Sequence, residues 1–326
     1  MASAILATVG SPIDVVTHDG VFHADEVVAI ATVALATPTM TQTVTVARSR
    51  DQKVIQQARI AVIDVGGLYK PYTEDTEAGP IDYLDHHQWQ PRKGEGLREN
   101  GVAYAAAGLT WKHYGRLVLW NMGCPEKVQS KVWKAIDQKV IQGIDALDTG
   151  TMPKADGPSL MSLSGLISSF NPRDGGDFDS AFLQAVDFAI GCLERLVRNE
   201  IAAAVAYQGV FSKAIDCQSQ VLVLESGSNW QEAVIVANEN KSRPIDFVVF
   251  PDPKGQWMVQ CVPPALGSFE KRVPLPEAWA AKRDQELAEL TGVADAIFCH
   301  AGRFICGAQS QAGALRLATL AFWATP

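Results

Sequence analysis

The segment that decides the fold is residues 13–26, Ile-Asp-Val-Val-Thr-His-Asp-Gly-Val-Phe-His-Ala-Asp-Glu. Its β-branched start, Ile13–Thr17, is typical of a buried strand, and the Ala- and Val-rich segment Ala24–Ala36 that follows predicts a helix. The turn between them carries two imidazoles, His18 and His23, and is followed by the carboxylate of Asp25. A strand that passes directly into a helix is the first half of a βαβ unit. We therefore expect a parallel sheet with polar side chains where this strand ends.

The same alternation of short β-branched runs and helical patterns continues along the chain, which indicates an α/β fold. In the first part we expect further strands at 43–47, 60–64 and 81–84, and helices at 102–115, 125–142 and 178–208. A second α/β stretch begins near residue 219, with expected strands at 220–224, 245–250, 256–262 and 294–299 and expected helices at 229–237, 276–290 and 309–322. The predicted architecture is a mostly parallel sheet domain at 1–175, followed by a smaller C-terminal α/β domain at 176–326. The turn-rich segment 168–177 places the boundary between 170 and 215, and the middle of the chain is largely helical.

Composition excludes several classes of protein. The 326 residues are 47% hydrophobic and 20% charged, which is typical of a globular protein and excludes a disordered or fibrous chain. A net charge of −8 argues against binding of duplex DNA through long-range attraction, because such binding uses many Lys and Arg residues. The six cysteines form no CxxC pair, and no apolar run approaches the roughly 18 residues that span a bilayer. With no signal-peptide pattern at the start, we expect a cytoplasmic protein with no membrane partner.

Histidines and carboxylates gather at the ends of three expected strands. His18, His23 and Asp25 follow the first, Asp64 ends the strand at 60–64 before two glycines, and Asp85-His86-His87 follows the strand at 81–84. Ligands of open α/β sheets bind at the carboxyl ends of the strands, so these groups should converge on one crevice. A single histidine there is more often structural, and Asp64 by itself could cap a turn, but the combination favours metal.

Imidazole and carboxylate ligands without cysteine suit Mn²⁺, Mg²⁺, Fe²⁺ or Zn²⁺ rather than a closed structural zinc site. Clustered acids would raise one another's pKa unless cations lay between them. A pair of divalent ions about 3.5–4 Å apart suits hydrolytic phosphoryl transfer, because it activates a water and stabilises the transition-state charge. We therefore expect two Mn²⁺ or Mg²⁺ ions per site.

Asp85-His86-His87, with His-x(4)-His-x-Asp and Asp-x-Gly upstream, resembles the DHH phosphoesterase superfamily, which includes RecJ nucleases and family II pyrophosphatases. Nearly the whole chain more closely resembles the melanocyte proliferating gene exonuclease family, also called metal-dependent protein hydrolases. The matching segments are THDGVFHADE (17–26), DVGG (64–67), LDHHQ (84–88), AAGLTWKHYG (106–115), GIDALDTG (143–150), SFNPRD (169–174), SFEKRVPLPEAW (268–279) and IFCHAGRFICG (297–307). The resemblance implies a DHH-like fold in the first domain.

The resemblance also implies roles for individual residues. His18, His23, Asp25 and His86 would bind metal, and Asp64 would bridge the two ions. Asp85 would support the site, and His87 would face the scissile phosphate. The last ligand would be Asp145 or Asp148, which share a helix face if the segment is helical, and Asp145 is preferred. Other superfamily members have an aspartate at the position of His23 and one fewer residue before it, so the division of ligands between the two ions stays open.

A second motif, His300-Ala301-Gly302-Arg303, follows the strand expected at 294–299. Glycine permits close backbone approach to a ligand, and the Arg303 guanidinium can form two hydrogen bonds to a phosphate. From spacing alone, Arg303 could equally be a surface residue beside a turn. The resemblance implies that this is the superfamily's C-terminal substrate-binding motif, so we expect His300, Gly302 and Arg303 to bind substrate. We also expect Arg303 to be a catalytic residue, as we do Asp85 and His87.

The expected function is a metal-dependent phosphodiester hydrolase, and the resemblance points to a 3′–5′ exonuclease acting on RNA or short oligonucleotides. Two alternatives remain open. One is a small-molecule phosphohydrolase acting on pyrophosphate, cyclic dinucleotides or nanoRNA, and the other is a metal-bound regulatory protein without turnover. Eukaryotic relatives are associated with the nucleus and mitochondrion, and the sequence leaves the native metal and the oligomeric state open.

Overall fold

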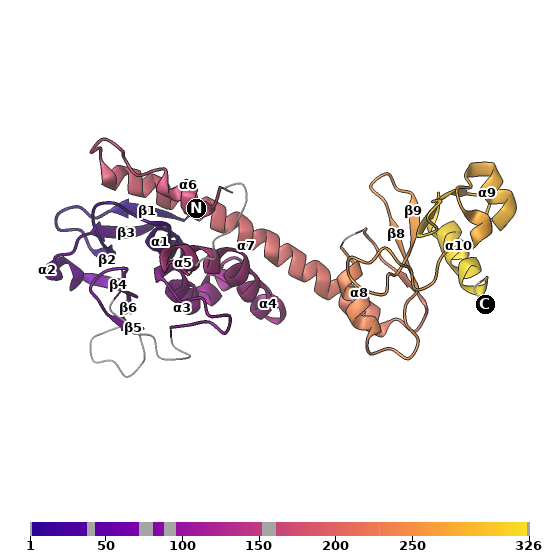
Figure 1. Ribbon diagram of the computed structural model, residues 1–326, viewed down its shortest axis with the longest axis horizontal. Helices are drawn as coiled ribbons and strands as arrows, with labels where there is room; N and C mark the ends of the chain where they lie inside the picture. Colours follow the sequence, from indigo (N-terminus) through magenta and orange to yellow (C-terminus); the bar gives the residue numbers. More distant parts are fainter. Residues whose placement is uncertain are drawn as a thin grey trace. The chain divides into compact units, whose positions relative to one another are not determined.

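The computed structural model describes residues 2–37, 43–71, 81–87, 96–151, 161–227 and 229–324. The chain divides into two compact units, Met1–Ala202 and Ala203–Pro326 (Figure 1). The division falls inside the long helix α7, Phe178–Asp216, and within the range of 170–215 given by the sequence. The assignment of a catalytic role to 1–175 and of a substrate-binding role to 176–326 stays a prediction.

The first unit is built on a mostly parallel sheet, as predicted. Within the described residues its strands are β1 (Ser3–Leu6), β2 (Ile13–Thr17), β3 (Thr43–Arg48), β4 (Ala58–Ile63), β5 (Tyr69–Lys70) and β6 (Asp82–Leu84), in the order β1-β3-β2-β4-β6-β5. All neighbours are parallel except β5 and β6. The central position of β2 explains its burial, because side chains on both faces of such a strand are covered. The sequence prediction does not include the four-residue β1 or the two-residue β5.

Helices pack around this sheet (Figure 1). They are α1 (Ala24–Ala36), α2 (Gln52–Ile55), α3 (Ala106–Asn121), α4 (Glu126–Ile136), a π-helical turn (Asp137–Ile141), α5 (Gln142–Asp148) and α6 (Leu163–Ser168). After its first turn, which carries Asp25 and Glu26, helix α1 is mostly apolar, and it is buried along nearly its whole length, which is expected of a helix inside a core. Its Thr32 hydroxyl donates to the Val28 carbonyl at 2.8 Å, so its buried polar side chain is satisfied. The helix predicted over 125–142 is found as α4 and the π-helical turn, and the helical segment continues through α5 to Asp148.

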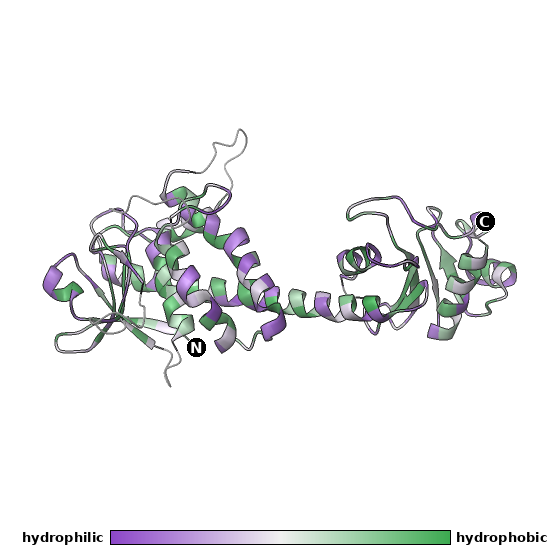
Figure 2. Ribbon diagram, turned by 90° about the horizontal axis from the view of Figure 1, so that it is seen from below, coloured by the Kyte–Doolittle hydropathy of each residue, from purple (hydrophilic) through white to green (hydrophobic). Residues whose placement is uncertain are grey.

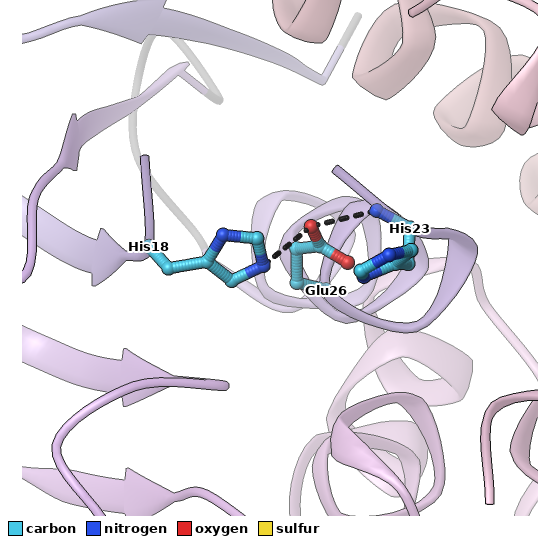
Figure 3. Close-up of side chains that lie close together, drawn as sticks. All are labelled: His18, His23 and Glu26. Carbon is cyan, nitrogen blue, oxygen red and sulfur yellow. Dashed lines mark hydrogen bonds and ion pairs between the residues drawn. The ribbon is translucent and has the colours of Figure 1, made fainter. Parts of the chain in front are cut away.

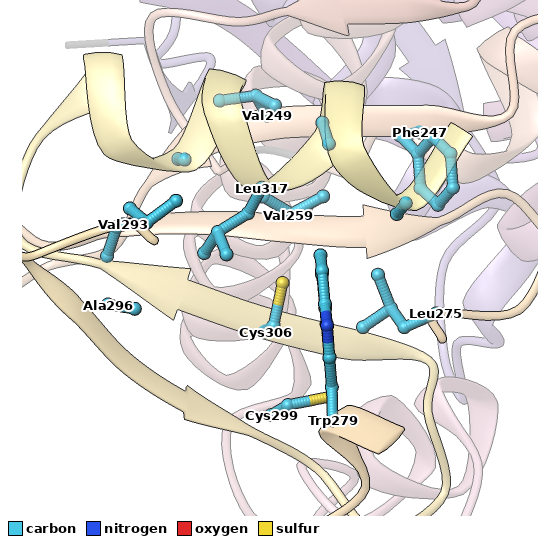
Figure 4. Packing of buried hydrophobic residues seen from close by; sticks show 14 of the residues in the cluster. Phe247, Val249, Val259, Leu275, Trp279, Val293, Ala296, Cys299, Cys306 and Leu317 are labelled. Carbon is cyan, nitrogen blue, oxygen red and sulfur yellow. The ribbon is translucent and has the colours of Figure 1, made fainter. Parts of the chain in front are cut away.

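The second unit has a mixed sheet with the order β10-β11-β9-β8-β7. Its described strands and helices are β7 (Val221–Val223), α8 (Gln231–Asn238), β8 (Phe247–Pro251), β9 (Trp257–Cys261), a 3₁₀ turn (Glu277–Trp279), α9 (Asp284–Thr291), β10 (Ala296–Cys299), β11 (Ile305–Ala308) and α10 (Gln311–Trp323). Only β7 and β8 are parallel neighbours among these strands, so this sheet is mostly antiparallel. The strands carry mostly hydrophobic residues (Figure 2). Leu317 of α10 packs into a core with Phe247, Val259 and Trp279 (Figure 4).

The described helices include none that is both long enough and apolar enough to cross a bilayer.

Candidate metal centre

The strand order brings the three predicted clusters to one edge of the first sheet. Strands β2, β4 and β6 are consecutive parallel neighbours, and their last residues are Thr17, Ile63 and Leu84. His18, Asp64 and Asp85 are the next residues along the chain. The expected convergence at the carboxyl ends of the strands is therefore what the fold produces.

His18 and Glu26 form the first half of the cluster (Figure 3). The His18 Nδ1 lies 3.0 Å from the Asp19 carbonyl, which leaves Nε2 facing the cluster at 3.0 Å from Glu26 Oε1 and 3.4 Å from Asp64 Oδ2. Glu26 Oε1 also accepts from the His23 backbone N–H at 2.8 Å. Sequence reasoning missed Glu26, although an acid three residues after a helix N-cap is a recognised capping pattern.

His86 lies at the centre of the second half. Its Nε2 is 3.2 Å from Asp148 Oδ2, 3.3 Å from Asp64 Oδ1 and 3.8 Å from Asp25 Oδ2. His87 Nδ1 lies 3.2 Å from the same Asp64 oxygen. Asp64 thus contacts His18, His86 and His87, and its bridging of two ions stays a prediction.

Buried oxygens without hydrogen-bond partners show that the residues present fit a divalent cation. Among the described residues, both carboxylate oxygens of Asp25, Oε2 of Glu26 and Oδ1 of Asp64 accept no hydrogen bond, and His86 Nε2 is also unpartnered. Burial of an unpaired carboxylate is strongly unfavourable. Four groups of three ligand atoms lie close enough to hold an ion: His18-His23-Glu26, Asp64-His86-His87, His23-Asp25-Asp148 and Asp25-Glu26-Asp64. Oxygen and imidazole donors of this kind suit Mn²⁺, Mg²⁺ or Zn²⁺.

The pKa values show how strained the cluster is without a cation. Burial, together with the neighbouring Asp64 and Glu26 carboxylates, raises the pKa of Asp25 well above its usual value. Burial would also raise the pKa of Asp64, but the close imidazoles of His18, His86 and His87 outweigh it and hold that pKa low. Burial would lower the pKa of His18, but Asp64 and Glu26 raise it to about 10. A cation among these groups would offset the charge of the acids and lower the pKa of both Asp25 and His18.

The Asp85 carboxylate holds the backbone at Gly67 and the ring of His87. It accepts from the Gly67 backbone N–H at 2.6 Å, the His87 backbone N–H at 3.0 Å and lies 3.0 Å from His87 Nδ1. The backbone turns sharply before it, with positive φ at Asp64, Gly66 and Gly67. Asp64 carries a side chain in this left-handed region, a strained conformation of the kind that clusters at functional sites.

Asp145 and Asp148, the two candidates for the last metal ligand, have different surroundings in the structure. Asp145 is fully buried away from the cluster, where Oδ2 pairs with Arg98 Nη1 at 2.7 Å and Oδ1 accepts from the Gly108 N–H at 2.9 Å. Asp148, one turn later, is the residue that contacts His86. The preference for Asp145 is therefore corrected, because its carboxylate is paired with the Arg98 guanidinium, whereas Asp148 contacts a histidine of the cluster.

Asn171 and Arg48 hold the loop that carries His18 and His23, and sequence reasoning did not assign either. The Asn171 amide accepts from the Phe22 N–H at 3.0 Å and donates to the Phe22 carbonyl at 2.8 Å, directly before His23. Arg48 donates to the Gly20 carbonyl at 2.5 Å, and its guanidinium lies 5.7 Å from the centre of the buried Phe22 ring. The only sequence signal was the position of Asn171 in the segment SFNPRD.

Two cavities open beside the cluster. One of about 730 Å³ has His18, His23, Asp64, Asp85 and His87 in its wall, together with Arg50. A second of about 480 Å³ is lined by His23, Asp25, His86, His87 and Asp148, with Ile144, Leu147 and Ser164. His87 lines both cavities and its side chain is 59% exposed, so it can reach a bound molecule.

The second predicted motif, residues 300–303, lies in the second unit. The Gly302 N–H donates to His300 Nδ1 at 2.9 Å, and the rings of His300 and Phe304 lie 4.6 Å apart. Arg303 has a positive φ of 56°, and its Nη1 donates to the Leu275 carbonyl at 3.4 Å. Substrate binding by His300, Gly302 and Arg303 stays a prediction.

The fold and the cluster together define a mixed α/β protein with a candidate metal centre at the strand ends of its first sheet. Residues 14–322 match the family described as Uncharacterised protein family (UPF0160), MYG1_exonuc, and the chain belongs to that family. It is 29% identical to the MYG1 protein of Dictyostelium discoideum over 94% of this chain and 96% of that protein. Identity is also 29% to the MYG1 exonuclease of Mus musculus, over 93% of this chain and 83% of that one. The chain is 31% identical to the MYG1 protein C694.04c of Schizosaccharomyces pombe, over 94% of this chain and 96% of that protein.

Among solved structures, RecJ from Thermus thermophilus in complex with Mn²⁺ aligns with 96% of this chain and 52% of its own length. The sequence identity is 13% and the TM-score 0.26, a likeness too loose to support an argument.

Proposed function

We propose that this protein is a divalent-metal-dependent phosphodiester hydrolase that acts as a 3′–5′ exonuclease on RNA or short oligonucleotides. The observation that carries the proposal is the buried group of unpartnered acceptors on Asp25, Glu26 and Asp64, surrounded by His18 and His86. The relative from Mus musculus is named an exonuclease, which supports this reaction class over other metal-dependent ones.

The side chains of the cluster have separate roles in the proposed hydrolysis. Divalent ions, when bound, would activate a water and offset charge on the phosphate, as they do in hydrolytic enzymes. His18, His23, Asp25, Asp64, His86 and Asp148 would hold two such ions, Mn²⁺ or Mg²⁺, and Glu26 is an additional candidate ligand. Asp85 fixes the His87 ring, so that its Nε2 is free to donate to a phosphate oxygen. In the metal-free cluster, the neighbouring Asp64 carboxylate raises the pKa of His87 to about 9.

The test uses purified protein with Mn²⁺, Mg²⁺ or EDTA and three substrates: end-labelled single-stranded RNA, DNA of the same sequence, and pyrophosphate. We expect metal-dependent release of nucleoside monophosphates from the 3′ end of the RNA, and no reaction in EDTA. Hydrolysis of pyrophosphate alone would favour a small-molecule phosphohydrolase instead. The absence of all hydrolysis with stoichiometric bound metal would favour a regulatory protein.

Two histidine variants sharpen this test. His87→Gln should lower turnover strongly while Mn²⁺ still binds. His113→Gln is the matched control, because His113 lies outside the cluster and contacts the Tyr69 hydroxyl at 3.1 Å. Equal turnover in both variants would remove His87 from the reaction.

A further inference from the structure

A third cavity adjoins the candidate metal centre. It has a volume of about 500 Å³ and is formed by residues of the π-helical turn, α5, α6 and α7, with Ser162 directly before α6. We call it the side pocket; its lining residues are Lys139, Val140, Gly143, Ile144, Leu147, Ser162, Leu163, Ser164, Cys192, Arg195, Leu196 and Asn199. Ile144, Leu147 and Ser164 also line the cavity that contains His86 and Asp148. The side pocket therefore lies directly beside the cavity at the cluster.

The walls of the side pocket are aliphatic. Leu147 and Leu196 leave 42% and 38% of their surface exposed there, although each is a large apolar residue. Exposed apolar surface that lines a concave site beside polar groups is typical of a ligand pocket. Its volume also lies in the range of about 300–1,000 Å³ found for small-molecule sites.

A few polar groups interrupt these walls. The side chains of Ser164 and Asn199 offer hydrogen bonds to the edge of a bound ring. Lys139 is engaged by Glu200 at 2.6 Å, whereas Arg195 has no ion-pair partner among the described residues. An aliphatic pocket with a few hydrogen-bonding groups next to a metal-binding cluster matches a molecule that is largely apolar at one end and anionic at the other.

We propose that the side pocket binds the nucleobase of the nucleotide whose phosphate lies at the metal centre. This rests on the proposed function, because it assumes a nucleotide phosphoester at the cluster. The aliphatic side chains of Leu147 and Leu196 contact the faces of the base, while Asn199 and Ser164 contact its edge. Inorganic phosphate or pyrophosphate would leave the pocket empty, so the pocket selects nucleotides over these anions.

Two glycines provide a matched test. Gly143 lines the side pocket and Gly191 does not, and a Cβ at either position meets no atom within 4 Å. Both lie in helices at ordinary backbone angles, so Gly143→Phe fills the pocket and Gly191→Phe adds the same side chain elsewhere. Calorimetry on the Mn²⁺-loaded proteins compares adenosine 5′-monophosphate with ribose 5-phosphate, which lacks the base.

We expect wild type and Gly191→Phe to bind adenosine monophosphate about tenfold or more tightly than ribose 5-phosphate, because the base buries apolar surface. Gly143→Phe should bring the two affinities together by weakening adenosine monophosphate alone. Equal affinities in wild type, or a preference that survives in Gly143→Phe, would overturn the proposal. Base-dependent binding without hydrolysis of any phosphodiester would keep the side pocket and reject the proposed function.

Alkylation of Cys192 gives a second measurement that needs no variant. Cys192 is a free, half-buried thiol in the wall of the side pocket. Mass spectrometry after iodoacetamide treatment should show that adenosine monophosphate slows its modification and that ribose 5-phosphate does not. Equal rates with both ligands would contradict occupation of the pocket by the base.

Discussion

Asp145→Asn and Asp148→Asn should separate stability from metal binding, although the two residues lie one helical turn apart. Asp145 is fully buried and pairs with Arg98, which is 8% exposed. Asp148 contacts His86 at 3.2 Å in the cluster. We expect the first substitution to weaken the fold and the second to weaken metal binding.

The size of the first effect follows from the buried ion pair. Removal of one partner of such a pair costs about 3–5 kcal/mol of the free energy of unfolding, because the other charge stays buried. Arg98 keeps its contacts with Asp137 at 2.8 and 3.2 Å, so we expect the lower end, about 3 kcal/mol. For a unit of this size, that lowers the midpoint of thermal unfolding by about 6–12 °C.

The assay is scanning calorimetry in EDTA, combined with a Mn²⁺ titration followed by the electron paramagnetic resonance signal of the free ion. The unfolding midpoint of metal-free Asp148→Asn should lie within a few degrees of that of metal-free wild type. Its Mn²⁺ affinity should fall at least 10- to 100-fold, because the loss of even an indirect contact to a metal has an effect of that size. Asp145→Asn should bind Mn²⁺ as wild type does below its unfolding midpoint. The reverse pattern, with weak binding in Asp145→Asn and normal binding in Asp148→Asn, would refute the assignment.

Three further outcomes are expected. Asn171→Ala removes both side-chain hydrogen bonds to Phe22 and should weaken Mn²⁺ binding with little change in substrate KM once Mn²⁺ is saturating; unchanged Mn²⁺ affinity would contradict the positioning role. Gly108→Ala should destabilise the fold by roughly 1–3 kcal/mol in denaturant unfolding, because its Cβ would lie 1.9 Å from Asp145 Oδ2; wild-type stability would show that the helices separate freely. The pKa of His18, about 10 against an ordinary 6.5, means that its ion pairs stabilise the metal-free fold below pH 6.5 and that this contribution is lost as pH rises through 10. A cation that binds His18 must displace its proton. Calorimetry of Mn²⁺ binding in buffers of different ionisation enthalpy should therefore show that binding releases a proton, and the Mn²⁺ affinity should rise with pH. Proton uptake on Mn²⁺ binding would contradict this.

Sequence patterns were sufficient for the three strands that carry the cluster and for the convergence of the cluster. The β-branched runs at β2, β4 and β6 are recognisable locally, and parallel neighbours must end at the same edge. Helix α1 was predicted with its observed bounds, Ala24–Ala36, because its composition and the polar turn before it are both local signals. These features depend on residues close together in the chain.

Contacts between distant segments decided the rest. The π-helical turn at Asp137–Ile141 adds a residue to one turn and so rotates α5 by roughly 100° relative to a regular continuation of α4. That rotation, together with the position of Arg98, directs Asp145 into the fold and leaves Asp148 to meet His86. Asn171 likewise meets Phe22 across 149 residues of sequence. Helical spacing specifies only that two side chains share a helix face, whereas the partners that each side chain meets are set by how the elements pack.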